Sequence, residues 1–262
     1  MTLRIALALR NGVGNLTSRT GMQLLVTYTT AFVLFQAAYN GLMARPYERM
    51  TVYGTRDIRA MQPAMIEATW LQVVVLILSV FAMGYLSVVA IRTFAARARR
   101  SFPADATSRK MTRAVHDFFV GGVACAVLST VGLAAFVVPG LFAMVSFVFV
   151  VVHVADQSEG LATAFRRSWR LASGNRLRIS TLLLAVGLIG TATLVVSAVG
   201  GALLVGANGP LGAISLGLAV VTGPISLYGL AVLTDAYTQL RDSEVEISDG
   251  QSTTADAPSA TV

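Results

Sequence analysis

Charged side chains are scarce in this sequence. They make up 13% of its 262 residues, whereas soluble domains carry roughly 25%. Hydrophobic residues account for 55% of the chain, so there is too little polar surface to cover a water-facing globule. The apolar residues also gather in long runs, which are typical of membrane spans rather than of a soluble core. We therefore predict an all-α, polytopic membrane protein.

Cysteine and histidine, which build many metal and redox sites, are almost absent. Cys125 is the single cysteine, and we expect it to be a small buried hydrophobe without a disulfide partner. The two histidines, His116 and His153, cannot form a histidine-rich metal site. The His-Glu-x-x-His motif, the Gly-x-Ser-x-Gly elbow and the Walker loop are missing too. We predict a non-catalytic protein with no metal and no cofactor.

Lysine is also nearly missing, since Lys110 is the single lysine among twenty basic residues. This bias indicates GC-rich coding and hints at a prokaryotic source, either actinobacterial or haloarchaeal. The formal charge of +7 is compatible with nucleic-acid binding. However, the basic residues lie in short segments beside apolar runs, which fits anionic headgroups better. We predict membrane lipids as partners, and no nucleic acid.

Six apolar runs are long enough to cross a bilayer. The stretch 118–155 would be about 57 Å long as one helix, against a hydrocarbon core of about 30 Å. Pro139 lies near its middle and removes a helix donor, so we expect a tight turn at Val138-Pro139-Gly140. Asn208-Gly209-Pro210 signals another turn. The predicted spans are about 21–43, 66–91, 118–138, 139–155, 179–206 and 211–236.

The basic residues orient these spans. With six spans, sixteen basic residues fall on one side of the membrane and four on the other. Lys and Arg accumulate on the cytoplasmic side, so we place both termini in the cytoplasm of a cell-membrane protein. Five or seven spans would remove the asymmetry. No cleavable signal peptide is expected, because Arg4 and Arg10 interrupt the first apolar stretch.

The chain divides into two parts by composition. Residues 1–240 form the six-span membrane domain, whose only sizeable exterior segment is Ala44–Met65. Residues 241–262 are rich in acidic and small polar side chains. Such a segment has little to bury, so we predict a disordered cytoplasmic tail.

Residues Glu159–Ser173 read EGLATAFRRSWRLAS and predict a basic amphipathic helix. Leu161 and Phe165 share its apolar face, and Gly174-Asn175 is a stop signal. A helix of this kind lies in the headgroup plane of a membrane. The side chains expected to meet lipid headgroups are Arg166, Arg167, Trp169 and Arg170.

A similar pattern occurs at the N-terminus. ALRNGVGNLTS (Ala8–Ser18) aligns with AFRRSWRLASG (Ala164–Gly174), and each segment precedes a predicted two-span hairpin. The shorter basic stretch Arg109–Val115 precedes the middle hairpin. Our hypothesis is three units, each a basic interfacial helix followed by a hairpin. The alternative is a chance match, because the aligned segments are short.

The segment from Pro139 to Arg178 carries a family resemblance. An apolar span opens with Val138-Pro139-Gly140, and Glu159-Gly160 is followed by AFRRSWRLASGNRLR. This pattern resembles the membrane domain of some glycerophosphoryl diester phosphodiesterases and related uncharacterised prokaryotic multi-helix membrane proteins. The resemblance implies a six-span fold and a membrane role. It implies no hydrolase activity, because the chain has no room for the catalytic barrel of those fusions.

The last two predicted spans carry small residues at every fourth position. Such ridges allow membrane helices to approach closely. We expect the two spans to cross along them, with self-association as the alternative. The ridge residues are Ala198, Ala202 and Gly206 in one span, and Ser215, Ala219 and Gly223 in the other.

His153 and Asp156 are the most suggestive ionisable pair. Three residues apart, they share a helical face near the cytoplasmic end of the fourth span. One interpretation is a proton relay, since ionisable groups within spans are often functional. The other, which we favour, is that Asp156 and Glu159 form a capping box for the following helix while His153 bonds a neighbouring carbonyl.

Two functions follow from these patterns. The leading prediction is a non-catalytic membrane protein that organises lipids or partner proteins through its basic cytoplasmic face. The alternative is a small-solute or lipid permease, because Gly223-Pro224 could break the last span at a transport site. A packing kink explains the same dipeptide. Charged residues deep in the spans are nearly absent, which disfavours transport of polar solutes.

Overall fold

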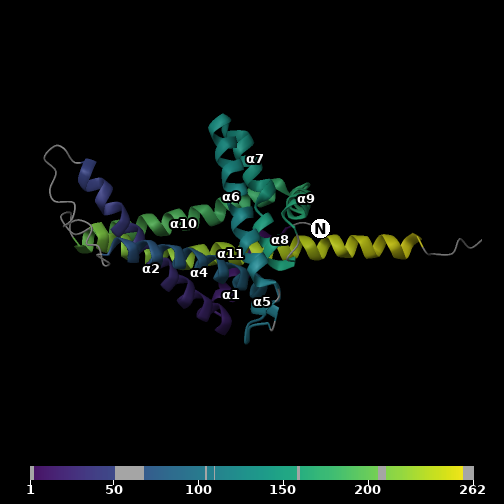
Figure 1. Ribbon diagram of the computed structural model, residues 1–262. Coiled ribbons are helices and arrows are strands. Elements are labelled where there is room, and N and C mark those ends of the chain that lie inside the picture. Colours follow the sequence, from purple (N-terminus) through teal and green to yellow (C-terminus); the bar gives the residue numbers. More distant parts are fainter. Residues whose placement is uncertain are drawn as a thin grey trace, which may run out of the picture.

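The structure is a computed structural model that describes the backbone of residues 3–50, 68–103, 105–108, 110–157, 160–205 and 211–255. Every regular element in these ranges is an α-helix (Figure 1). The helices are α1 (Ile5–Leu16), α2 (Arg19–Met50), α4 (Thr69–Ala95), α5 (Asp105–Ser108), α6 (Met111–Ala135), α7 (Val137–Phe147), α8 (Val150–Gln157), α9 (Leu161–Ala172), α10 (Arg176–Val205) and α11 (Leu211–Ala255). The predicted all-α class is confirmed.

Six helical segments are long and apolar enough to cross a membrane, which confirms the predicted number. They are Arg19–Met43, Thr69–Ala95, Met111–Ala135, Val137–Gln157, Arg176–Gly201 and Ser215–Ser243. Parts of the predicted organisation lie outside the described residues, namely 51–65 of the exterior segment, the Asn208-Gly209-Pro210 turn and the ridge residue Gly206.

The hydrophobic core lies at one end of the helices. Its fully buried members include residues from the last turns of α4 (Val88, Ile91), from α8, from the start of α10 and from α11 near Tyr237. α1 packs along α11, and Asn11 donates a hydrogen bond to Asp235 at 3.1 Å. We call this end, where α4 and α8 finish and α6, α9 and α10 begin, the basic end of the bundle. Arginines from five segments surround it: Arg97, Arg113, Arg166, Arg176 and Arg241.

The middle hairpin turns at a different residue from the one predicted. Phe136 has an extended backbone (φ −160°, ψ 142°) and separates α6 from α7, so the turn at Val138-Pro139-Gly140 was wrong. Pro139 instead lies in the first turn of α7, where its missing N–H has no intrahelical partner to lose. The two limbs approach closely, because a Cβ atom at Gly132 would lie 2.8 Å from the Cα of Gly140.

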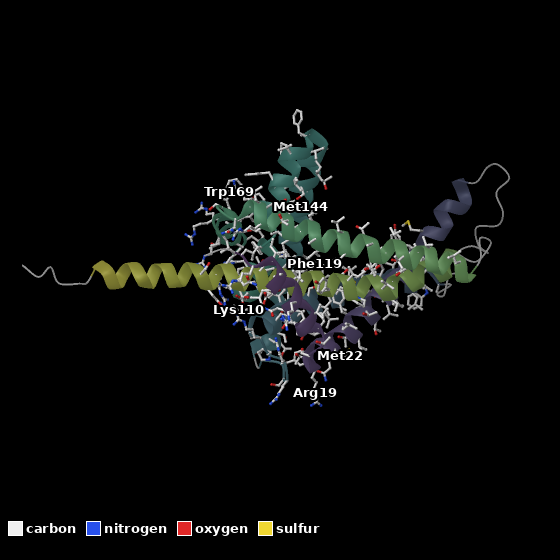
Figure 2. All side chains as sticks on the ribbon, turned by 180° about the vertical axis from the view of Figure 1, so that it is seen from behind. Arg19, Met22, Lys110, Phe119, Met144 and Trp169 are labelled. Carbon is white, nitrogen blue, oxygen red and sulfur yellow. The ribbon has the colours of Figure 1, made fainter. Side chains whose placement is uncertain are left out.

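This hairpin runs across the rest of the molecule. In Figure 1, α2, α4, α10 and α11 all reach the left side of the picture, whereas α6 and α7 run upward and project beyond them. Figure 2 shows the same projection from behind. Between residues 122 and 144, Gly140 is the one buried residue. The outer part of the hairpin therefore packs mainly on itself.

α11 is longer than the sequence predicted. We predicted disorder from residue 241, whereas α11 continues through Ala255. Extending an existing helix avoids the cost of nucleation, which accounts for helical backbone in a segment with little to bury.

The short helices bear on the repeat hypothesis. α1 and α9 are both twelve residues long, and each precedes a long apolar helix. The middle counterpart is different: α5 has four residues, and Met111 already begins α6. The N-terminal and C-terminal units thus have the same order of elements, while the middle unit lacks a separate amphipathic helix.

Candidate functional site

A polar cluster surrounds the hydroxyl of Tyr237 at the basic end of the bundle. Tyr237 lies on α11 and is buried. Its hydroxyl is 3.0 Å from Nδ1 of His153 and 3.5 Å from Oδ2 of Asp156, and it accepts a hydrogen bond of 3.3 Å from the amide of Gln157. Three neighbouring polar side chains of α8 thus converge on one hydroxyl of α11.

Two arginines extend this cluster. Arg241, one turn after Tyr237, donates from Nη1 to Oδ2 of Asp156 at 3.0 Å, and its guanidinium lies 5.6 Å from the Tyr237 ring centroid. Arg167 of α9 donates to Oε1 of Gln157 at 2.8 Å. We call His153, Asp156, Gln157, Arg167, Tyr237 and Arg241 the Tyr237 cluster. It ties α8, α9 and α11 together.

These contacts correct the prediction for Asp156. It lies inside α8, which continues to Gln157, and α9 begins after Gly160 with no side-chain cap. Asp156 therefore does not cap α9, and Glu159 lies outside the described residues. The structure does bring His153 and Asp156 together, since both contact the Tyr237 hydroxyl. Their shared partner is a phenol on a distant helix.

Arg92 joins three elements at the same end. It is buried near the end of α4. Its Nε donates to the carbonyl of Ala155 at 2.8 Å, and its Nη1 donates to the carbonyl of Ala106 at 3.2 Å. A cation at the C-terminus of α8 also matches the negative end of that helix's dipole. From the sequence alone, Arg92 is predicted only as one of the basic residues in the loop after the second span.

The basic amphipathic helix is present as α9, and its two faces are distinct. Ala164, Ser168, Leu171 and Ala172 are buried, and the Ser168 hydroxyl donates to the carbonyl of Ser146 at 2.9 Å. The opposite face leaves Arg166, Trp169 and Arg170 exposed. Arg167 is separated from these three, because it is half-buried and bonds Gln157.

Trp169 belongs to an aromatic and cationic stack. Its ring meets that of Phe142 edge-on at 5.5 Å. The Arg176 guanidinium lies 4.4 Å from the Phe142 ring centroid and 4.6 Å from that of Trp169, which is close enough for cation–π attraction to both. Figure 2 shows Trp169 beside the base of the projecting hairpin. The stack joins α7, α9 and the start of α10.

Two residues of the predicted ridge on α11, Ser215 and Gly223, contact α2. The Ser215 hydroxyl accepts a hydrogen bond of 2.6 Å from Asn40 of α2. A Cβ atom at Gly223 would lie 2.9 Å from the Cα of Thr29, also on α2. α10 approaches α11 at other positions, where a Cβ at Gly190 would lie 3.3 Å from the Ile225 side chain.

The remaining ridge residues are placed less fully. Ala219 is buried on α11 and Ala198 is half-buried on α10. The side chain of Ala202 lies outside the described residues, as does Gly206. The part of the ridge on α11 that the structure describes therefore mediates close packing against α2.

An apolar cleft of about 860 Å³ lies between α4 and α6. Phe81 and Tyr85 of α4 and Phe119 of α6 line it, and the Phe81 and Phe119 rings meet edge-on at 5.7 Å. Thr112 and His116 border it near the start of α6. A cleft of this size and lining suits an acyl chain better than a polar solute.

Comparison with known proteins gives one match. Residues 3–240 match a family model described as a domain of unknown function (DUF7847). The chain belongs to the DUF7847 family. No curated protein and no solved structure matches it. The matched range contains the whole Tyr237 cluster except Arg241, as well as α9 and the projecting hairpin.

Sequence reasoning missed the contacts of three residues in this DUF7847 chain, namely Tyr237, Arg241 and Arg176. Tyr237 and Arg241 are four residues apart near the end of an apolar run, so they share a helical face, and that spacing was a usable signal. From the sequence, Arg176 is only one of the sixteen basic residues assigned to one side of the membrane, because nothing local indicates its contact with Phe142. All three depend on contacts between helices distant in the sequence.

Proposed function

We propose that this DUF7847 protein is a non-catalytic integral protein of the cell membrane, with both termini in the cytoplasm, that organises anionic lipids at its cytoplasmic face. The observation that carries the proposal is the two-faced packing of α9. Its apolar face is fixed to α7 and α8, which holds Arg166, Trp169 and Arg170 outward in one row.

The grouping of arginines supports the orientation. Arg97 lies 3.7 Å from Asp242, so the segment after α4 meets the C-terminal part of α11. A Cβ atom at Gly14 of α1 would lie 3.8 Å from Arg99. The N-terminal, middle and C-terminal basic segments thus share one end of the bundle. Each basic residue near an anionic membrane surface contributes about 1 kcal/mol of attraction, which favours placing this end in the cytoplasm.

The Trp169 stack supports contact at headgroup depth. Trp and Arg combine an apolar body with a polar tip, and both concentrate at membrane interfaces. Stacking on Phe142 and Arg176 holds the Trp169 ring in place. The resemblance to the membrane domain of glycerophosphoryl diester phosphodiesterases adds to the case for a membrane role without catalysis.

Lipid retention tests the proposal. Anionic and zwitterionic lipids that co-purify with the protein are quantified by mass spectrometry for the native chain and for Arg166→Glu/Arg170→Glu. We expect the double variant to lose its preference for anionic lipid. The matched control is Arg99→Glu/Arg100→Glu, which makes the same charge change at exposed residues outside α9. Equal loss in both variants, or no loss in either, would contradict a specific role for α9.

A lipid permease is the second candidate. The α4–α6 cleft favours it, because the cleft is apolar and lies between two apolar helices. Gly223-Pro224 gives this candidate little support, since α11 continues as one helix through Pro224. Movement of labelled lipid between leaflets of proteoliposomes, absent from protein-free vesicles, would raise this candidate above the first.

A further inference from the structure

We infer that the α6–α7 hairpin does not cross the bilayer but enters the cytoplasmic leaflet from the basic end and returns to it, so that α2, α4, α10 and α11 make the crossings among the helices that the structure describes. This inference rests on the proposed membrane orientation. It adds that the partner of the hairpin is the acyl-chain layer of one leaflet.

The direction of the α6–α7 hairpin supports this arrangement. The hairpin runs across the four helices that reach the opposite end of the molecule (Figures 1 and 2). The base of α6 packs at the basic end, where Met111, Val115 and Phe118 contact the core that contains Tyr237. A hairpin that leaves the bundle sideways from this level does not reach the far end of the spans.

The length of α7 also supports it. α7 has 11 residues, which span about 16 Å, whereas the hydrocarbon core is about 30 Å thick. A turn at Val148 and Phe149 separates α7 from α8. α8 is then buried within the bundle, where Val150, Val152 and Val154 are almost fully enclosed. Of the 21-residue apolar segment Val137–Gln157, only the α7 part therefore lies outside this enclosed region.

Phe142 anchors α7 near the basic end. Phe142 stacks with Trp169 and Arg176, two residues suited to headgroup depth. The hairpin turn at Phe136 lies six residues from Phe142, which is about 9 Å of helix. One leaflet provides about 15 Å of hydrocarbon, half of the core thickness. The tip therefore fits inside the leaflet nearest the anchor.

The surface of the hairpin tip is apolar. Phe136 is 74% exposed and Val138 is 77% exposed. The outward side chains of α6 include Val123, Val127 and Val131, one every helical turn. At the base of α6 the character changes, because Arg113 lies 3.5 Å from Asp117 and His116 lies 3.0 Å from it. An apolar tip on a charged base matches hydrocarbon beside a headgroup layer.

The distribution of charge fits this arrangement as well as it fits six crossings. A hairpin that returns to its starting side leaves the basic segments before α6 and after α8 on the same side as before. The sixteen-to-four asymmetry of basic residues is therefore unchanged. It excludes an odd number of crossings but does not distinguish four from six.

Cysteine labelling in intact cells tests the inference. In a Cys125→Ala background, a Gly-Ser-Cys-Ser-Gly linker is inserted between Ala135 and Phe136, and an impermeant maleimide is added outside. We expect no labelling of the linker until the cells are permeabilised. Asn208→Cys is the exterior control, and Asp105→Cys is the cytoplasmic control. Exterior labelling of the linker, at the level of Asn208→Cys, would overturn the hairpin arrangement.

The controls separate the two levels of the proposal. If Asp105→Cys reacts from outside and Asn208→Cys does not, the orientation itself fails. If both controls behave as expected and only the linker reacts from outside, the proposed orientation stands and the hairpin inference fails.

Depth measurement covers the case in which the linker reacts with neither treatment. Phe136→Cys protein is labelled with a fluorophore in detergent and reconstituted into vesicles of phosphatidylglycerol and phosphatidylcholine. We expect stronger quenching by lipids brominated in the acyl chain than by lipids carrying a headgroup quencher. Strongest quenching at headgroup depth would contradict burial of the tip in a leaflet.

Discussion

α4 and α6 are similar in sequence character and different in surroundings. Both are apolar helices of more than 24 residues, with 27 in α4 and 25 in α6. α4 buries an unbroken stretch from Ser87 to Phe94, whereas α6 buries only Ala114, Asp117 and Gly121. Hydropathy alone would assign both helices the same place. Apolar character thus indicates that a helix suits a membrane, but it does not indicate which other helices that helix contacts.

Polar and small residues indicate the protein-facing surface of a helix better than hydropathy does. The buried face of α4 includes Gln72, Ser79, Ser87 and Thr93. On α2 the Gln36 amide donates to Asn40 at 2.8 Å, and Asn40 donates to Ser215 at 2.6 Å. Helix association in lipid depends on close packing and such hydrogen bonds, because lipid tails are as apolar as leucine. The outer part of α6 instead exposes Val123, Val127 and Val131.

Gly223→Leu should give the largest difference in stability between the bundle and the α6–α7 hairpin. The leucine side chain would meet the backbone of Thr29, where a Cβ atom alone lies 2.9 Å from Cα. Overpacking of this kind costs about 3 kcal/mol, so the unfolding midpoint in detergent should fall clearly. Gly217→Leu on the same helix and Gly122→Leu on α6 are matched controls with nothing within 4 Å. A fall of equal size in a control would contradict the packing argument.

Arg92→Leu should have the next largest effect. It removes the donors to the Ala155 and Ala106 carbonyls, and an unsatisfied buried carbonyl costs about 2 kcal/mol. Stability in detergent reports the loss. Arg100→Leu, at an exposed position beyond the helix, should leave the midpoint unchanged. If Arg92→Leu were as stable as the native chain, Arg92 would not hold α4, α5 and α8 together.

Asp156→Asn should lower stability by about 1 kcal/mol, because it weakens the charge-assisted contact with Arg241. If Asp156 capped α9, Asp156→Asn would leave stability nearly unchanged, because asparagine also caps helices. A double-mutant cycle with Arg241→Gln measures the coupling. We expect the second substitution to cost little once the first is present. Independent, additive losses would show that the pair does not interact.

Val127→Ala should have the smallest effect. Val127 is 57% exposed on the outer part of α6, so its truncation leaves no cavity in the protein. Val232→Ala, at a residue with 0% exposure on α11, should cost about 1 kcal/mol through lost packing. Thermal unfolding of the two variants compares hairpin and bundle directly. Equal losses would mean that Val127 has a protein partner.

Sequence reasoning predicted the helical class and the number of apolar helices because both depend on local composition. It missed the crosswise course of α6 and α7, since the lipid-facing and transverse arrangements share the same hydropathy. It placed the hairpin turn at Pro139 because proline ends helix interiors, while the first turn of a helix tolerates it. For Asp156 it correctly found the neighbour His153. It did not pair them with Tyr237 and Arg241, because these partners lie more than 80 residues away in the sequence.

The position of the core has a consequence for how the protein meets membranes of different thickness. Ile179 and Leu182, at the start of α10, are fully enclosed, whereas Leu203 near its other end is 79% exposed. In the proposed membrane arrangement, a helix held at one end and surrounded by lipid at the other can change its tilt at little cost. Adjusting tilt is a common response to hydrophobic mismatch. In a thinner bilayer, α10 should therefore lean while the basic end and its contacts keep their shape.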